Sequence, residues 1–179
     1  MPALETLRDR LPAYAKDLAL NLGALAGETT LNEQQKWGAF LASAYAVATP
    51  TVVQAIEAAA VEAGLSDEAR AAAKTAAAMM GMNNVYYRAL HIMHDAQYRA
   101  LPTRLRMNVL ANPGVPKTDF ELWEMAVSAI HGCGACLDAH NEALKKHDVP
   151  ATAIQAALRI AAVVHAVTRV VAAEEAAAA

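Results

Sequence analysis

The stretch that decides the fold is TDFELWEMAVSAIHGCGACLDAH, residues 118–140. It begins with Thr118 and Glu121 at capping-box spacing and continues with apolar residues at helical intervals. Gly132 weakens or ends this helix, and the cysteine motif opens a second one over about residues 133–147. Both cysteines of the chain, Cys133 and Cys136, lie at this second start. The stretch therefore predicts two helices joined at a glycine, with sulfur at the junction.

Helical patterns fill the rest of the chain, and strand patterns are almost absent. Shorter helical pieces at 97–111 lead into a loop at 112–117, and no Gly-, Ser- or Pro-rich linker divides the chain. We therefore expect one all-α domain over residues 1–179, with a low-complexity tail at about 173–179 that frays. Further helices are predicted over about 2–25, from a capping box at Thr30–Glu33 through Tyr45, from Pro50 to Gly64, from an N-cap at Ser66 towards His94, and from Pro150 onward.

The composition favours packed helices and argues against several classes of protein. Apolar residues make up 56% of the 179, much of this alanine, and the net charge is only −3. The chain has no run of basic residues, which argues against a nucleic-acid-binding surface. Residues 1–12 lack the apolar core of a signal peptide, and the apolar stretch 159–179 is interrupted by Arg169 and Glu174, so we expect no membrane span. We expect a cytoplasmic protein, where close cysteine pairs are usually catalytic or metal-binding.

A weak internal similarity suggests a duplicated helical hairpin. AMMGMNNVYYRAL at 78–90 aligns with AIHGCGACLDAHN at 129–141, at an offset of 51. The alignment pairs Gly81 with Gly132 and Val85 with Cys136. If the alignment is correct, only the second copy carries sulfur.

The spacing of the two cysteines favours redox chemistry. Residues at i and i+3 share one helical face, so the sulfurs of Cys133 and Cys136 can meet. A disulfide that closes so small a loop would constrain the unfolded chain little. The positive end of a helix dipole, in contrast, favours the reactive thiolate. Two other interpretations stay open at this point: two small buried apolar residues, or a zinc site with His140 and His131 as further ligands.

His140 and Glu121 are the candidate partners of the thiols. His140 is four residues after Cys136 and lies on the same helical face, where an imidazole can accept a thiol proton. His131 flanks the motif and is a weaker candidate. Glu121 has two interpretations: it caps its own helix at Thr118, or it orients His140 in a carboxylate–imidazole–thiol relay. The local pattern alone favours capping.

The motif as a whole resembles the signature of the alkyl hydroperoxide reductase D (AhpD) family, within the carboxymuconolactone decarboxylase-like superfamily. The similarity extends over nearly the whole chain, including YAKDLALNL (14–22), MGMNNVYYR (80–88), LRMNVLANPG (105–114) and PKTDFELWEMAVSAIHGC (116–133). It implies an AhpD-like helical fold and a homotrimer, sometimes a higher oligomer. The matching signature residues are Glu121, Trp123, Cys133, Cys136 and His140.

The resemblance also implies an activity and a role for each residue. It implies a peroxidase for organic (alkyl) hydroperoxides or peroxynitrite, in which Cys136 becomes the sulfenic acid and also attacks the partner protein. Cys133 resolves that acid as a disulfide and donates a proton, while His140 and Glu121 relay protons. The helix dipole alone would favour Cys133 as the more acidic thiol, whereas the i+4 histidine favours Cys136. Some members have a relay histidine where this chain has Ala135, so the relay runs without it or uses His131.

The resemblance names electron donors and partners but no bound cofactor or metal. The implied reductant is a dihydrolipoyl group, which is carried by a lipoyl-bearing acyltransferase and re-reduced by dihydrolipoamide dehydrogenase. An AhpC-type peroxiredoxin is the implied redox partner. Two alternatives remain: a dithiol electron-transfer adaptor with little peroxidase activity of its own, and a small zinc-binding module. Lactone decarboxylation, the older superfamily reaction, does not require the cysteine pair.

Overall fold

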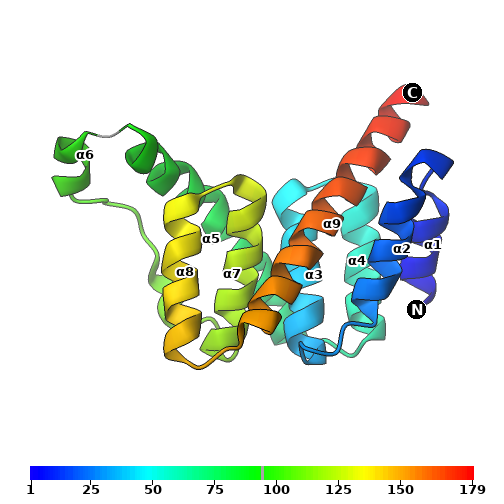
Figure 1. Cartoon of the computed structure of the whole chain (residues 1–179), viewed down its shortest axis with the longest axis horizontal. Coiled ribbons are helices and arrows are strands. Elements are labelled where there is room, and N and C mark those ends of the chain that lie inside the picture. Colours follow the sequence, from blue (N-terminus) through cyan, green and yellow to red (C-terminus); the bar gives the residue numbers. More distant parts are fainter. Residues whose placement is uncertain (94) are drawn as a thin grey trace.

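The computed structural model describes residues 1–93 and 95–179, and within these ranges it contains helices and no strand (Figure 1). The prediction of an all-α fold is confirmed. The elements are α1 (Pro2–Asp9), the 3₁₀ turn η1 (Ala13–Ala15), α2 (Lys16–Ala26), α3 (Glu33–Val47), α4 (Pro50–Glu62), α5 (Asp67–Ile92), α6 (Ala96–Ala100), the 3₁₀ turn η2 (Asn108–Ala111), α7 (Lys117–His131), α8 (Gly134–Lys146) and α9 (Ala151–Ala177).

Several predicted helix boundaries agree with the structure. Pro50 is the first residue of α4, and the Ser66 hydroxyl caps α5 by accepting the N–H of Ala69 at 3.1 Å. Pro150 precedes α9 as predicted. The helix α5 ends at Ile92, and His94, towards which it was expected to run, lies outside the described residues.

Other boundaries differ for clear local reasons. The helix expected over 2–25 is divided into α1, η1 and α2, because Pro12 has no N–H to continue the hydrogen-bond ladder. Asn32, not Thr30, caps α3, in a reciprocal capping box with Gln35. Helix α9 ends at Ala177, and fraying of residues 173–179 stays a prediction.

The chain contains two three-helix units whose boundaries correspond at an offset of 84 residues. Adding 84 to the first residues of α3, α4 and α5 (33, 50 and 67) gives those of α7, α8 and α9 (117, 134 and 151). The left-handed residues correspond too: Ala48 with Gly132, and Gly64 with Asp148. The alignment at an offset of 51 is therefore not the structural one, because it pairs Gly132 with Gly81, which lies inside α5.

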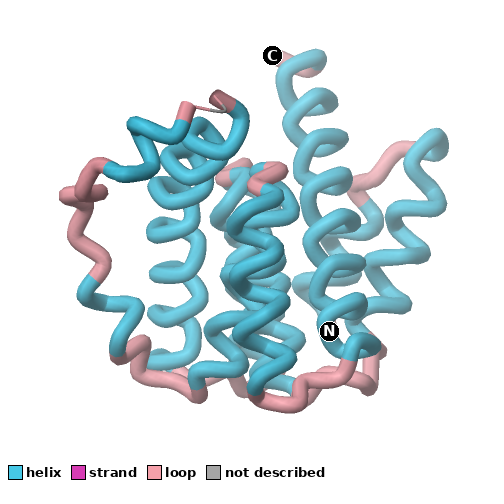
Figure 2. Tube along the Cα trace, turned by 60° about the vertical axis from the view of Figure 1, so that its left-hand side comes forward, coloured by secondary structure: helices cyan, strands magenta, loops and turns pink. Residues whose placement is uncertain are grey.

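The contacts between helices follow the same relation. Four helices, α3, α5, α7 and α9, pack together in the core, while α4 contacts α3 and α9, and α8 contacts α7 and α5. Figure 2 shows these helices side by side, with the connecting loops gathered at their ends. On the side of α4, α1 and α2 complete the body, and α6 lies on an arm that protrudes at the other end (Figure 1).

The two units meet most closely where α3 crosses α7. A Cβ atom at Gly38 would lie 2.1 Å from the Trp123 ring, so only glycine fits there. The Trp123 indole N–H donates to the Gln35 carbonyl at 3.0 Å. The buried carboxylate of Asp119 accepts from the side-chain amides of Gln34 at 2.7 Å and Gln35 at 2.8 Å. These contacts fix the position of α7, the helix that carries Glu121.

One helix in the described part of the chain, α9, is long and apolar enough to cross a membrane by length and composition alone. Its buried residues include Ile160, Val164 and Val167, and it contacts α2, α3 and α7. A core helix passes the same test of length and composition. Its packing in the core accounts for part of its apolar sequence.

Candidate functional site

The junction between α7 and α8 places the cysteines. Gly132 adopts a left-handed conformation (φ 66°), and the N–H of Cys133 reaches back to the Ser128 carbonyl at 3.1 Å, which ends α7 in a Schellman-type turn. Cys133 is then the N-cap of α8, and its sulfur accepts the backbone N–H of Cys136 at 3.4 Å. The start of α8 is one residue later than predicted, because Cys133 acts as the cap itself.

The two cysteines form a disulfide but differ in their surroundings. Cys133 is fully buried, with 0% of its surface exposed, and is not among the residues that line the cavity beside Cys136. Cys136 is 7% exposed and forms part of a cavity wall. A small molecule that enters this cavity therefore meets the sulfur of Cys136 first.

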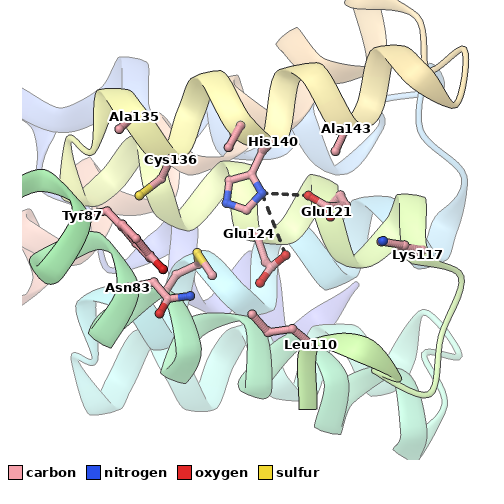
Figure 3. Close-up of a pocket in the computed structure, with 12 residues that line it drawn as sticks. Asn83, Tyr87, Leu110, Lys117, Glu121, Glu124, Ala135, Cys136, His140 and Ala143 are labelled. Carbon is pink, nitrogen blue, oxygen red and sulfur yellow. Dashed lines mark hydrogen bonds and ion pairs between the residues drawn. The ribbon is translucent and has the colours of Figure 1, made fainter. Parts of the chain in front are cut away.

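The cavity has a volume of about 390 Å³ and lies between α5, α7 and α8 (Figure 3). Its apolar wall includes Met80, Leu110 and several alanines, which suits a small organic molecule. The ionisable side chains are concentrated on α7 and α8, with Tyr87 facing them from α5. The polar residues that line it are Asn83, Tyr87, Lys117, Glu121, Glu124, Cys136 and His140.

Glu121 and His140 form the central hydrogen bond of this site. His140 Nδ1 lies 2.8 Å from Glu121 Oε2, and both side chains are largely buried. The other ring nitrogen of His140 faces the side of the cavity where Cys136 lies (Figure 3). A carboxylate on Nδ1 fixes the tautomer in which the far nitrogen can accept a proton. The prediction that Glu121 caps its own helix is therefore wrong: α7 begins at Lys117 after Pro116 and has no side-chain cap.

Glu124 is a site residue that the sequence interpretation missed. Its carboxylate is 3.9 Å from His140 Nδ1, and its Oε1 atom is buried without a hydrogen-bond partner. Burial, and next the charge of Glu121, raise its pKa to about 8, while Lys117 acts in the opposite direction. The available signal was its spacing: Glu124 follows Glu121 by three residues and so shares its helical face.

His131 and Ala135 were considered from the sequence for the additional relay histidine of some family members, and only Ala135 is among the residues that line the cavity. His131 is not among the residues that line the cavity, and its Nδ1 contacts Asn84 Oδ1 at 2.9 Å. Asn84 also donates to Ser128 at 2.9 Å, and Arg88 donates to the His131 carbonyl, so this group ties α5 to α7. Ala135 lines the cavity and leaves space there. A catalytic role for His131 stays a prediction.

The described residues contain one cluster with the donor atoms of a metal site: Glu121, Glu124 and His140, whose atoms lie within 4.8 Å of one another. The 2.8 Å separation of His140 and Glu121 is that of a direct hydrogen bond. We therefore interpret the cluster as an acid–base group. The zinc set considered from the sequence is not assembled in this structure, because both sulfurs are in the disulfide and His131 contacts Asn84.

Comparisons with known proteins identify the family of this chain. Residues 96–179, which include α7 to α9, match the carboxymuconolactone decarboxylase family. The alkyl hydroperoxide reductase AhpD of Hyphomonas neptunium is 60% identical, over 99% of this chain and 98% of its own length. The AhpD proteins of Maricaulis maris and Streptomyces coelicolor are 58% and 53% identical, over 96% and 92% of this chain and 99% and 92% of their own lengths. The chain therefore belongs to the AhpD family of alkyl hydroperoxide reductases.

Proposed function

We propose that this protein is a thiol peroxidase that reduces organic hydroperoxides, and peroxynitrite, through a dithiol–disulfide cycle of Cys136 and Cys133. The observation that carries the proposal is the position of Cys136 on the wall of a largely apolar cavity that also contains the Glu121–His140 pair. Alkyl hydroperoxides combine an apolar body with a polar O–O group, which suits such a cavity. The names of the relatives support the same reaction class.

The first half of the cycle oxidises Cys136. The far nitrogen of His140 takes the thiol proton, while Glu121 on Nδ1 stabilises the imidazolium that forms. The thiolate attacks the terminal peroxide oxygen, the O–O bond breaks, and an alcohol leaves after protonation. Cys136 is then a sulfenic acid.

The second half closes the disulfide. The Cys133 sulfur attacks the sulfur of the sulfenic acid, and the thiol hydrogen leaves with the hydroxyl as water. The burial of Cys133 suits this role, because the resolving thiol has to meet only Cys136 and not the substrate. The difference in exposure supports Cys136 as the residue that meets peroxide, although Cys133 is nearer to the helix N-terminus.

Further parts of the proposal concern electron donors and assembly. We propose that a dihydrolipoyl group re-reduces the disulfide, supplied by a lipoyl-bearing acyltransferase and dihydrolipoamide dehydrogenase, and that an AhpC-type peroxiredoxin accepts electrons from Cys136. A cytoplasmic location fits this reductant system. We also propose a homotrimer. The exposed apolar side chains of Ile92, Met93, Tyr98 and Leu101, in and next to the α6 arm, are suited to subunit contact.

A coupled assay tests the proposal. NADH oxidation is followed with dihydrolipoamide dehydrogenase, lipoamide, tert-butyl hydroperoxide and this protein, beside Cys136→Ser and Cys133→Ser. We expect turnover by the wild type and a loss of at least about 10³-fold in Cys136→Ser, because the nucleophile is removed. Cys133→Ser should consume at most one peroxide per chain and then stop. Full turnover by Cys136→Ser would refute the cycle, and activity only after addition of a peroxiredoxin would identify an electron-transfer adaptor.

A further inference from the structure

Glu124 has no role in the proposed cycle, although it lines the same cavity as Cys136 and His140. Glu124 lies one helical turn after Glu121 on α7, and its side chain points into the cavity below His140 (Figure 3). The residue is 4% exposed, and its Oε1 atom has no hydrogen-bond partner. A buried polar atom without a partner is costly, so its presence in the cavity that Cys136 also lines calls for a functional explanation.

The surroundings of Glu124 favour its neutral form. The other ionisable groups that line the same cavity are Glu121 and Lys117 on α7, His140 and Cys136 on α8, and Tyr87 on α5. Burial and the Glu121 charge together raise the pKa of Glu124 to about 8. Two ionised carboxylates in this space would also oppose formation of a thiolate at Cys136, since like charges repel strongly where water is scarce. A protonated Glu124 removes that conflict and carries a transferable proton.

We propose that Glu124 is a further catalytic residue, the acid that protonates the leaving oxygen of the hydroperoxide; this rests on the proposed peroxidase function. As the Cys136 sulfur bonds to the terminal peroxide oxygen, the O–O bond breaks and its electron pair goes to the alkoxide oxygen. The Glu124 carboxyl gives its proton to that oxygen, which leaves as the alcohol. Cys136 gains the hydroxyl as a sulfenic acid, and Glu124 becomes a carboxylate.

The same residues return the proton to Glu124. His140 has already taken the proton of the Cys136 thiol, and His140 Nδ1 lies 3.9 Å from Glu124 Oε2. A small rotation of either side chain closes that distance to a hydrogen bond. The imidazolium thus gives one proton to Glu124, from Nδ1, and keeps the thiol proton on its far nitrogen, which balances the proton given to the alcohol. The ring returns to its starting tautomer by proton exchange with water before the next turnover. In this scheme Glu121 holds the imidazole and Glu124 holds the transferable proton.

The test exploits the leaving group. Fully reduced wild type and Glu124→Gln are mixed in single turnover with tert-butyl hydroperoxide or with peracetic acid, and the loss of free thiol is followed. Glutamine keeps the shape and polarity of the side chain but is not an acid. With tert-butyl hydroperoxide, whose alkoxide must be protonated, we expect the variant to be slower by about 10²-fold. With peracetic acid, whose acetate leaves without a proton, the two proteins should react at similar rates.

Glu142→Gln is the matched control, because it makes the same glutamate-to-glutamine substitution at an exposed position on α8. It should behave as wild type with both peroxides. Equal loss with both peroxides in Glu124→Gln would mean a structural role, and no loss with either would mean that another group supplies the proton; each result overturns the inference. If the wild type itself fails to react with both peroxides, the proposed function fails instead.

Discussion

The two three-helix units, α3–α5 and α7–α9, have corresponding boundaries and turns. At four corresponding positions, however, the side chains are apolar in the first unit and ionisable in the second. In the first unit these positions are apolar and at most 1% exposed, and the indole and phenyl rings stack with centroids 5.1 Å apart. In the second unit they are four of the ionisable residues that line the cavity. The pairs are Trp37 and Glu121, Phe40 and Glu124, Val52 and Cys136, and Ile56 and His140.

This difference in side chains indicates that the first unit mainly contributes stability and that the second contains the candidate site. Large apolar side chains fill the first unit, and α1 covers α4 from outside. In the second unit smaller, polar side chains leave a cavity of about 390 Å³ beside α8. Since buried apolar area is the main source of stability, we expect the first unit to support the fold and the second to depend on that support.

The largest effect should come from truncating His140, the residue of the second unit that corresponds to Ile56 in the first. His140→Ala should lower peroxide turnover by about 10²- to 10⁴-fold, because the proposed general base is lost. Its free energy of unfolding should change by only about 1 kcal/mol, the value of one hydrogen bond. The coupled NADH assay and urea unfolding of the oxidised protein measure the two quantities.

The corresponding change in the first unit should give the opposite result. Ile56 is fully buried, so Ile56→Ala should lower the free energy of unfolding by about 2–5 kcal/mol and leave turnover per folded molecule unchanged. A strong loss of turnover in Ile56→Ala, measured where the variant is folded, would show that the units do not divide stability and chemistry.

A smaller effect should appear in the pH dependence of stability. The pKa of Glu124 is raised from 4.5 to about 8 in the folded protein, so between these values the folded state holds a proton that the unfolded state has lost. The free energy of unfolding therefore falls as pH rises from about 4.5 to 8, and levels off above. Glu124→Gln should be more stable than wild type by on the order of 3 kcal/mol near pH 9, with little difference near pH 4.5.

Urea unfolding of the oxidised proteins checks this, since disulfide-bonded cysteines do not titrate. Glu142→Gln, at an exposed position, should show no such pH-dependent gain. A gain of equal size at both pH values would indicate improved packing rather than removal of a buried charge.

The smallest effect concerns the left-handed turns that end α3 and α7. Ala48 (φ 63°) and Gly132 (φ 66°) correspond, but only glycine adopts this conformation without steric cost. Ala48→Gly should raise the free energy of unfolding by about 1 kcal/mol, and Gly132→Ala should lower it by a similar amount. Space is not limiting at Gly132, where nothing lies within 4 Å of an added Cβ. Thermal unfolding of the two variants should therefore shift in opposite directions.

The repeat shows why part of this fold could not be predicted from the sequence. At the offset of 84, every identical position between residues 33–92 and 117–176 is an alanine. Alanine pairs carry almost no information in an alanine-rich chain. The two units correspond in their helix lengths and turn conformations and not in their residues. The alignment at 51 matched Gly81 to Gly132 by residue type, although Gly81 lies inside α5 and Gly132 ends α7.

The site illustrates a similar limit. The cysteines and His140 could be predicted because they lie within one helix, where spacing determines the shared face. Glu121 and Glu124 lie on another helix, and their orientation depends on the crossing of α7 with α3 at Gly38. Local rules assigned Glu121 to a cap, while the tertiary contact with His140 decided its position. Only the family signature joined these two helices in advance.

The crossing of α3 and α7 also determines which structural changes alter the tryptophan fluorescence of the protein. Both tryptophans of the chain are buried there or beside it, Trp37 on α3 and Trp123 against Gly38, and neither lines the cavity. Intrinsic fluorescence should therefore follow the separation of the two units and respond little to the chemistry of Cys136. Emission spectra and peroxide consumption, recorded on one sample, can then distinguish a variant that has lost its framework from one that has lost only its reaction.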